Sequence, residues 1–291
     1  MLINYKNPTV IAEIGCNHKG DIKIAKKMIE VASSCGASYV KFQKRDNKYL
    51  LKERYNIPHP VPENSYGKTY GLHREFLEFN MKQHLELYKF CLKKKIKYSV
   101  SVWEKKSAIN FIKSKIKLDY IKIPSACNFD FELLEVLCRK FKKKIHISLG
   151  MTSFKEIKEI VKFVKNYKRL NDVVFYACTS DYPASFDNTK LLEITSLRSK
   201  YLKKVNDIAF SGHHLGIGID IAAYTLGANI IERHFTLDRT WKGTDHAASL
   251  EPQGLEKLVR ELKNSYKSLK FKKGNGILNA EKSQRKNLKQ M

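Results

Sequence analysis

The sequence predicts a (β/α)8 barrel, an α/β fold in which eight parallel strands alternate with eight helices. Short apolar runs typical of buried strands alternate with segments of helical periodicity over about 260 residues, which is the length and element order of this barrel. A doubly wound sheet is the main alternative, but no G-x-G-x-x-G motif follows the first apolar run. The sequence therefore favours the closed barrel.

The elements follow one another with recognisable starts and ends. TVIAEI is the first strand, and Asp21 stands where it would cap the next helix, which Gly36 would end. The last two strands lie in AFSGHH and IIERHF, on either side of the helical segment IGIDIAAYTLGAN. Before them we expect strands at 9–14, 39–43, 98–102, 120–123, 144–148 and 173–177; the other helices are expected at 22–34, 75–95 (in one or two pieces), 104–114, 131–140, 153–166, 188–200 and 252–269.

Two segments fall outside the alternating pattern. The polar stretch 44–72 carries three prolines and is expected to be an ordered loop or lid. After the last helix the chain becomes polar and basic. We therefore expect one barrel domain, residues 1–269, and a partly disordered C-terminal tail, residues 270–291.

The composition limits the classes of partner. The chain carries 55 Lys and Arg against 29 Asp and Glu, which indicates either an anion-binding surface or solvated helix faces. Runs such as KKKIK and RKFKKK at predicted helix ends favour solvated faces, and no basic motif interleaved with aromatic residues predicts nucleic-acid binding. The six cysteines lack C-x-x-C spacing, and neither a signal peptide nor an apolar run of membrane-spanning length is present. We expect a cytoplasmic protein with no membrane partner.

Polar side chains gather where the predicted strands end. In a (β/α)8 barrel these positions converge on one face, which is where the active sites of such barrels lie. The residues concerned are Glu13, Asn17, His18, Lys41, Gln43, Ser99, Ser101, Lys122, Ser125, Ser148, Thr179, Ser180, Asp181, Tyr182, Ser211, His213, His214, Glu232 and His234, with Asp245 on the loop after the last strand.

Lys41 and Lys122 are charged residues inside otherwise apolar strands, where an unpaired ammonium group would be costly. Together with several hydroxyls they predict a cradle for a phosphate or carboxylate. The alternative is that each lysine is neutralised by a barrel acid such as Glu13 or Glu232. Because the two lysines occupy equivalent strand positions, we favour the cradle.

His213 and His234 leave adjacent strands at equivalent positions, which favours a divalent metal with nitrogen and oxygen ligands. The alternative is a pair of hydrogen-bonded core histidines. Asp245, in KGTDH, is either a loop cap or a catalytic group. Cys127 is most simply a packed thiol.

The chain resembles the sialic acid (N-acetylneuraminate) synthase family over most of its length, from about Thr9 to Glu261. A block such as KFQ is weak by itself, whereas CTSDYPA, HFTLD and DHAASLEP in series are specific. The matching blocks, in order, are AEIGCNHKGD, VKFQ, KIPSA, SLGMTS, CTSDYPAS, SGHHLGI, IERHFT and GTDHAASLEP.

This resemblance implies a transferase that condenses phosphoenolpyruvate with an open-chain N-acylated aldose similar to N-acetylmannosamine. The product would be a nine-carbon 2-keto acid, phosphate would be released, and Mn2+ or Mg2+ would be the cofactor. The resemblance implies that His213 and His234 bind the metal and that Glu13 and Asp245 orient the sugar or water and move protons. The substrate-binding residues that it implies are Lys41, Gln43, Ser101, Lys122, Ser125 and Ser211, with Ser180 and Tyr182 on the sugar side.

Three departures from the family pattern stand out. Cys127 occupies a position where the family usually has an acid, so Glu13 or Asp245 would have to cover its role. The family's SDHT is SGHH here, with an aspartate lost at Gly212 and an imidazole gained at His214. The sequence also stops near the linker to the family's antifreeze-like domain, so we expect a catalytic barrel without that domain. The exact sugar and the swapped dimer of the family stay open, with a homo-oligomer as a candidate state.

Two other functions remain open. One is a phosphoenolpyruvate-dependent synthase of 3-deoxy-ketoaldonate phosphates, for which Arg239 and Lys242 would supply a second phosphate site, although the series of motifs argues against it. The other is a catalytically weakened barrel that binds sugar or phosphate in a surface-polysaccharide pathway. The departures at Cys127 and Gly212 motivate this third hypothesis.

Overall fold

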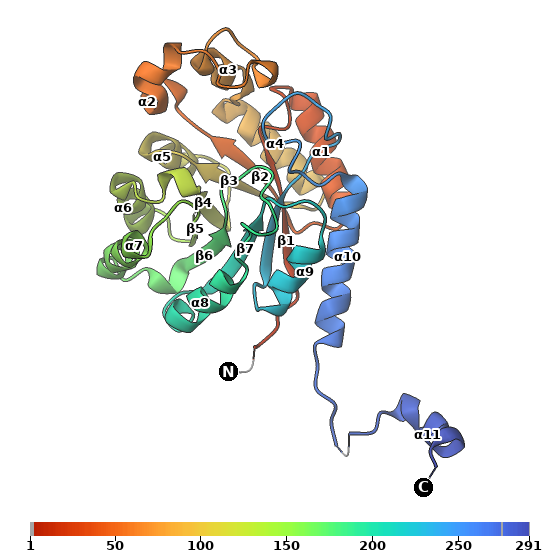
Figure 1. Ribbon diagram of the computed structural model, residues 1–291. Coiled ribbons are helices and arrows are strands. Elements are labelled where there is room, and N and C mark those ends of the chain that lie inside the picture. The colour runs from red at the N-terminus through yellow and green to blue at the C-terminus, as the bar shows by residue number, and fades with distance from the viewer. Residues whose placement is uncertain (1–2, 275, 291) are drawn as a thin grey trace.

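The computed structural model describes residues 3–274 and 276–290 (Figure 1). Eight parallel strands form one closed barrel in sequence order, which confirms the predicted (β/α)8 fold. The barrel closes where β8 pairs with β1, with Glu13 opposite His234. The strands are β1 Thr9–Gly15, β2 Tyr39–Lys44, β3 Lys97–Val102, β4 Tyr120–Ile123, β5 Lys144–Ser148, β6 Val173–Cys178, β7 Asp207–Gly212 and β8 Ile230–His234.

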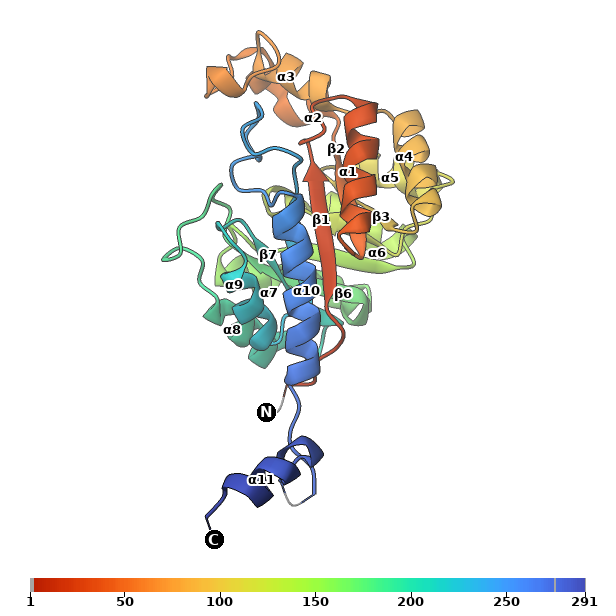
Figure 2. The same cartoon turned by 90° about the vertical axis from the view of Figure 1, so that its right-hand side faces the viewer.

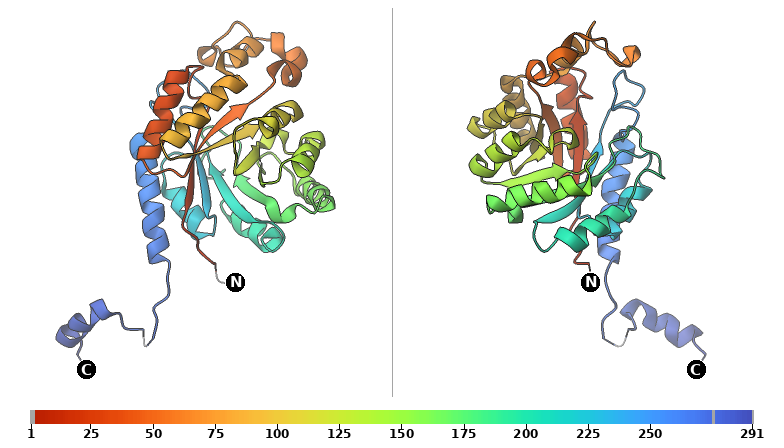
Figure 3. Two further views of the ribbon diagram at one scale, coloured as in Figure 1. Left: turned by 180° about the vertical axis from the view of Figure 1, so that it is seen from behind. Right: turned by 60° about the vertical axis from the view of Figure 1, so that its left-hand side comes forward.

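Helices surround the barrel, as the views from opposite sides show (Figures 1 and 3). The last long helix, α10, packs against both α9 and α1 and so closes the outer ring (Figure 2). The helices of the ring and of its connections are α1 Ile22–Ser34, α2 Asn47–Leu51, α3 Tyr70–Leu77, α4 Met81–Lys93, α5 Lys105–Lys113, α6 Phe131–Lys140, α7 Phe154–Asn166, α8 Leu192–Tyr201, α9 Gly218–Thr225 and α10 Pro252–Ser268.

The strand period of two divides the buried residues into two sets. The larger set lies between the strands and the helices and is apolar, with Val40, Val100 and Ile121 as examples. Inside the barrel, a small apolar cluster that includes Ile11 and Tyr176 lies below the polar positions, toward the amino ends of the strands. Two residues further along β1, β2, β4, β7 and β8 the inward positions are polar or charged, namely Glu13, Lys41, Lys122, Ser211 and Glu232. This change of polarity places the charged groups at the carboxyl ends of the strands.

The expected elements are present, with differences at some ends. The helix expected at 75–95 is two helices, α3 and α4, because Asn80 caps the start of α4 in a capping box. The helix expected at 188–200 begins only at Leu192. Before it the backbone turns, since the amide of Asn188 donates to Ser185 O at 3.2 Å and the Thr179 hydroxyl donates to Asn188 O at 2.8 Å.

The segment between β2 and α4, residues 45–80, is ordered and holds α2, α3 and two short 3-10 helices, Lys52–Asn56 and Pro62–Asn64. The prolines lie in and before the second of these turns. After α10 the chain leaves the barrel, and its last helix, α11 Lys282–Leu288, lies apart from it (Figures 1 and 3). The domain ranges predicted from the sequence also include positions 1, 2, 275 and 291, which lie outside the described residues. No helix in the described part of the chain is long and apolar enough to cross a membrane.

Candidate active site at the carboxyl ends of the strands

A cavity of about 340 Å³ opens at the carboxyl ends of the strands. Its wall contains every residue that the sequence analysis assigned to catalysis, substrate binding or metal binding. These residues are Glu13, Lys41, Gln43, Ser101, Lys122, Ser125, Ser180, Tyr182, Ser211, His213, His234 and Asp245.

Two buried ion pairs form the floor of the cavity. Lys41 Nζ lies 2.5 Å from Glu13 Oε2, and Lys122 Nζ lies 2.6 Å from Glu232 Oε1. The same oxygen of Glu232 is 3.7 Å from Lys41 Nζ, so the two ammonium groups converge on one carboxylate. Each lysine is therefore paired with a barrel acid, which the sequence left open as the alternative to an anion cradle. Both lysines nevertheless also line the cavity.

The electrostatics of the floor follow from burial and from these pairs. Burial would raise the pKa of Glu232, but the charges of Lys122 and Lys41 hold it below its usual range. Burial lowers the pKa of Lys122, and Glu232 opposes that shift. The Lys122 ammonium also lies 4.0 Å from the centre of the Tyr176 ring, a cation–π contact. The floor thus keeps its charges in a low-dielectric setting.

Hydroxyl and amide groups surround the ion pairs. The Ser101 hydroxyl accepts a hydrogen bond from Lys41 at 2.7 Å, and the Ser211 hydroxyl donates to Glu232 at 3.1 Å. The Gln43 amide donates to Glu13 Oε1 at 3.0 Å. These groups hold the charged side chains in place without neutralising them.

A second group of hydroxyls lies near the tight turn after β5. The amide of Gly150 donates to Ser125 Oγ at 3.1 Å. A Cβ at position 150 would lie 2.4 Å from Ser180 Oγ and 2.8 Å from Ser125 Oγ, so only glycine permits these hydroxyls to approach the backbone. Cys178 Sγ, 3.3 Å from Ser125 Oγ, completes this side of the wall.

The two histidines lie side by side at the ends of β7 and β8, with ring centres 5.5 Å apart. His213 Nδ1 is 2.6 Å from the carbonyl oxygen of Thr179. Because a carbonyl only accepts, Nδ1 carries the proton and Nε2 keeps a free lone pair. Burial lowers the pKa of His213 to about 3, and the neighbouring His234 adds to this shift, so the ring is neutral at pH 7.

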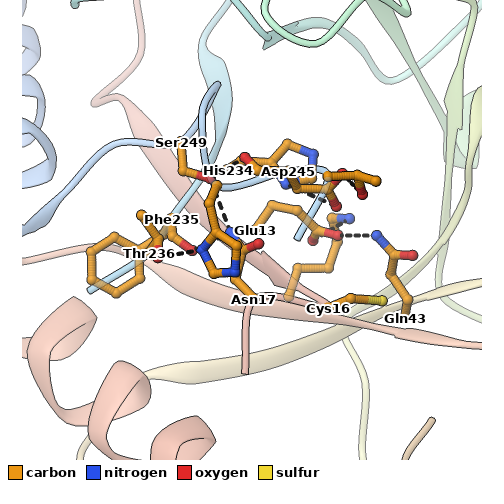
Figure 4. Close-up of polar contacts among 12 residues, drawn as sticks. Glu13, Cys16, Asn17, Gln43, His234, Phe235, Thr236, Asp245 and Ser249 are labelled. Carbon is orange, nitrogen blue, oxygen red and sulfur yellow. Dashed lines mark hydrogen bonds and ion pairs between the residues drawn. The ribbon is translucent and has the colours of Figure 1, made fainter. Parts of the chain in front are cut away.

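His234 lies close to both carboxylates that the sequence analysis assigned to catalysis, since it pairs with Glu13 in the β1–β8 register and approaches Asp245. Its Nδ1 is buried, has no hydrogen-bond partner among the described residues and is 3.8 Å from Asp245 Oδ2. Figure 4 shows His234 next to Asp245, with Glu13 nearby and bonded to Gln43. Burial would raise the pKa of Asp245, but His234 and Arg74 hold it below its usual value.

The two imidazoles fit a divalent cation. Among residues 3–274 and 276–290, no group of three or more His, Cys, Asp or Glu side chains lies close enough together to hold a metal ion. His213 nevertheless has the arrangement typical of a metal ligand, with one ring nitrogen bonded to a backbone carbonyl and the other open. His234 offers a buried nitrogen without a partner. Such a pair leaves several coordination positions for substrate oxygens or water.

The departures from the family pattern have structural counterparts. Cys127 is buried, and burial raises the pKa of its thiol to about 12, as expected for a packed thiol. A Cβ at Gly212 would lie 2.8 Å from the His214 ring and 3.0 Å from Arg233 Cδ. The extra imidazole of His214 is buried, with Nε2 3.3 Å from Asp220 Oδ2, which also pairs with Arg233 Nη1 at 2.5 Å. His214 thus belongs to a buried network.

Among the residues of the cavity wall that sequence reasoning missed are Arg45, Arg74 and Trp103. Arg45 stands two positions after Gln43, so the period-2 pattern of β2 carried the signal for it. Nothing in the local sequence singled out Arg74, which lies on α3. The cations that the sequence analysis proposed for a second phosphate site are elsewhere. Arg239 donates to Ala247 O at 2.7 Å, beside a different hollow, and Lys242 lies over the Tyr66 ring.

The fold and the site together define a (β/α)8-barrel enzyme. Its ionisable groups, hydroxyls and imidazoles meet in one cavity at the carboxyl ends of the strands.

A family model described as "NeuB family" matches residues 28–274, and the chain belongs to this family. It is 39% identical over 261 residues to the human N-acetylneuraminate-9-phosphate synthase, covering 87% of this chain and 69% of that protein. It is 34% identical to the N,N'-diacetyllegionaminic acid synthase of Campylobacter jejuni, covering 97% and 82%. The crystal structure of an N-acetylneuraminic acid synthetase from Leptospira borgpetersenii superposes with a TM-score of 0.80 at 29% identity, covering 97% and 93%.

Proposed function

We propose that the protein condenses phosphoenolpyruvate with an N-acylated aldose in its open-chain form. The product is a nine-carbon 2-keto sugar acid of the sialic acid type, and inorganic phosphate is released. The observation that carries this proposal is the convergence of two lysines with two open imidazoles and three carboxylates in one cavity. Membership of a family whose relatives are named as synthases of such acids supports it.

The reaction forms one carbon–carbon bond and breaks one carbon–oxygen bond. C3 of the enolpyruvate attacks the aldehyde carbon of the sugar, and the aldehyde oxygen takes up a proton. Water then attacks the cationic C2 and loses a proton, and phosphate leaves with its bridging oxygen. Phosphoenolpyruvate, aldose and one water molecule give the keto acid and phosphate, so no redox partner is needed.

Lys41 and Lys122 bind phosphoenolpyruvate in this proposal, with hydroxyls around them. Both ammonium groups lie within 3.7 Å of one Glu232 oxygen, so one anion placed above the floor can contact both. The carboxylates that neutralise the lysines in the free protein offset the cost of burying them. Hydrogen bonds to the anion come from the hydroxyls of Ser101, Ser125 and Ser211.

Glu13 and Asp245 orient the sugar and the attacking water and move protons. Asp245 is suited to accept a proton because His234 and Arg74 keep its carboxylate ionised despite burial. Gln43, which is bonded to Glu13, holds that carboxylate in place. Ser180 and Tyr182 line the sugar side of the cavity.

His213 and His234 hold Mn2+ or Mg2+ in this proposal. When bound, such a cation supplies Lewis-acid polarisation of the sugar carbonyl. The proposal rests on the open Nε2 of His213 and the unpartnered Nδ1 of His234.

The acceptor is an N-acylated aldose, and the relatives differ in their products, one being named for a 9-phosphate and another for diacetyllegionaminic acid. The test is a phosphate-release assay with phosphoenolpyruvate, Mn2+ and a panel of aldoses. We expect release that depends on an N-acylated aldose. Release only with aldose phosphates that lack an acyl group would instead support a 3-deoxy-ketoaldonate phosphate synthase. Binding of phosphoenolpyruvate without release with any aldose would indicate a catalytically weakened binding barrel.

A further inference from the structure

The loop between β8 and α10, residues 235–251, begins directly after His234 and carries Asp245. Its two ends meet at the end of β8. The amide of Leu250 donates to His234 O at 2.8 Å, and the amide of Thr236 donates to Leu250 O at 3.0 Å. These bonds fix the base of the loop to the strand. Asp245 lies beyond that base, so its place beside His234 depends on what holds the rest of the loop.

Asn17 reaches this loop from the turn after β1, across the seam where β8 pairs with β1. It is 2% exposed and does not belong to the described cavity wall. Its amide nitrogen donates to Phe235 O and to Ser249 Oγ, both at 2.9 Å (Figure 4). Phe235 is the first residue of the loop, and Ser249 stands near its end. One buried side chain therefore holds both ends of the loop.

The chemistry of the groups fixes the direction of each bond. The Asn17 amide nitrogen only donates, and the backbone oxygens of Phe235 and Asp245 only accept. Ser249 Oγ lies 2.9 Å from that nitrogen and 2.7 Å from Asp245 O. The Ser249 hydroxyl therefore accepts from Asn17 and donates to Asp245. Both protons of the amide and the one proton of the hydroxyl are in use, so the loss of either group ends the series of bonds.

One branch of this series holds the residue that follows His234. The amide of Phe235 donates to Glu13 O at 2.8 Å, and its carbonyl oxygen accepts from Asn17 at 2.9 Å. The backbone just after the imidazole is thus held through both of its polar groups. Without Asn17 the Phe235 oxygen would lose this bond in a buried setting, and the backbone that carries His234 would be less firmly placed.

The other branch holds Asp245. Its Oδ2 is 3.8 Å from His234 Nδ1, and its Oδ1 accepts from the neighbouring Thr244 hydroxyl at 3.0 Å. The Thr244 bond lies within the loop and does not tie the carboxylate to the barrel. The bond from Ser249 to Asp245 O does so, because it connects the backbone of Asp245 to the base of the loop and, through Asn17, to the β1–α1 turn.

We infer that Asn17 is a positioning residue, which sets the Asp245 carboxylate and the His234 imidazole relative to each other through Ser249 and Phe235. This inference rests on the proposed function, in which Asp245 moves protons and His234 holds the cation. A misplacement of about 1 Å can slow a reaction about 100-fold. Loss of a group behind a metal ligand lowers metal affinity or activity by about 10- to 100-fold.

Two variants cut the series at different points. Ser249→Ala removes the bond to Asp245 and leaves the bond from Asn17 to Phe235. We expect its kcat in phosphate release to fall about 10- to 100-fold, with nearly unchanged Mn2+ affinity and KM for phosphoenolpyruvate. Asn17→Ala removes both branches, so its kcat should fall at least as far and its Mn2+ affinity should fall about 10-fold in electron paramagnetic resonance. A general loss of stability would not separate the two variants in this way.

The matched control is Asn229→Ala, which truncates another buried asparagine just before the opposite end of β8. Asn229 is 4% exposed, and its Oδ1 accepts from the amide of Lys6 at 3.1 Å. The control should lower the urea concentration of unfolding, as Asn17→Ala does, and should leave kcat and Mn2+ affinity unchanged. Equal losses of kcat in Asn229→Ala and Asn17→Ala would assign the effect to destabilisation and overturn the inference.

The possible failures are distinguishable. Wild-type kcat in folded Asn17→Ala and Ser249→Ala would overturn the inference and leave the proposed function standing. If wild type releases phosphate with no aldose, the proposed function fails, and crystal structures of wild type and Ser249→Ala test the positioning without turnover. Ser249→Ala also carries the test if Asn17→Ala does not fold. We expect the Asp245 carboxylate to move relative to His234 in that variant, and an unchanged distance between them would overturn the inference.

Discussion

Lys122 Nζ lies 2.6 Å from Glu232 Oε1 inside the barrel, and both side chains are buried. The pair links β4 to β8 across the barrel interior and forms part of the cavity floor. The two roles of this ion pair place opposite demands on its stability. It must be stable in the free protein, and it must still offer its cation to a bound anion.

Removal of the carboxylate should destabilise the fold. In Glu232→Gln the Lys122 ammonium stays buried without its partner, and we expect the free energy of unfolding to fall by about 3 kcal/mol at pH 7. Because the folded-state pKa of Glu232 lies below its ordinary 4.5, its stabilising contribution is complete above that value and is lost as the pH falls below it. The difference between wild type and variant in urea unfolding should therefore shrink from pH 6 to pH 3. A constant difference would contradict the ion pair.

Removal of the lysine should weaken phosphoenolpyruvate binding. Lys122→Met keeps most of the side-chain volume and deletes the charge, so we expect affinity to fall by about 100-fold in calorimetry. The control is Lys97→Met, which removes an exposed lysine whose partner is Asp119. Circular dichroism melting checks that the variant is folded. Wild-type affinity in a folded Lys122→Met would exclude the anion cradle.

If His234 is a metal ligand, its removal should abolish Mn2+ binding. His234→Ala should remove Mn2+ binding, measured by electron paramagnetic resonance of the free ion, and should abolish metal-dependent turnover while the protein stays folded. His59→Gln, a histidine of the segment between β2 and α4 that does not belong to the described cavity wall, should bind Mn2+ as the wild type does. Unchanged Mn2+ binding by His234→Ala would show that the imidazole is not a ligand.

Gly212 should tolerate no side chain. A Cβ there would lie 2.8 Å from the rings of both His214 and Phe210, so Gly212→Ala should cost about 1–3 kcal/mol of unfolding free energy. Gly218→Ala is the matched control, because a Cβ at the start of α9 meets nothing within 4 Å. We expect that control to unfold at or slightly above the wild-type urea concentration. Equal stability of the two variants would contradict the packing around His214.

Local rules predicted most of the barrel because each element carries its own signals. The predicted bounds of α1, β4, α6 and β5 agree with the structure, since caps such as Asp21 and regular apolar spacing mark their ends. The predicted start of α8 was wrong, because a turn bond from Asn188 N to Ser185 O and a bond from the Thr179 hydroxyl to Asn188 O hold that segment outside the helix. The bond from Thr179, nine residues earlier in the chain, is not part of any helix-start pattern.

The candidate site was predictable to the extent that strand ends converge. The rule that inward positions alternate placed Lys41 and Lys122 in the cavity, and Glu13 and Glu232 were named as acids that could neutralise them. The sequence could not decide whether the lysines would be paired, or show that both would approach one oxygen of Glu232. Arg74 lies on α3, directly before the helix expected at 75–95, and no local pattern says which way it points, so only the folded chain brings it to the wall. Arg239 shows the reverse error: it lies near the motifs in the sequence and was proposed for the site, but in the structure it lines a different hollow.

The most direct test of the central proposal follows carbon atoms from one substrate to the product. Phosphoenolpyruvate labelled with 13C at all three carbons is incubated with Mn2+ and with N-acetylmannosamine or its 6-phosphate, and the products are analysed by mass spectrometry. The proposed condensation predicts a nine-carbon keto acid that contains three 13C atoms, in equal amount to the phosphate released. Labelled pyruvate beside unchanged sugar would contradict it.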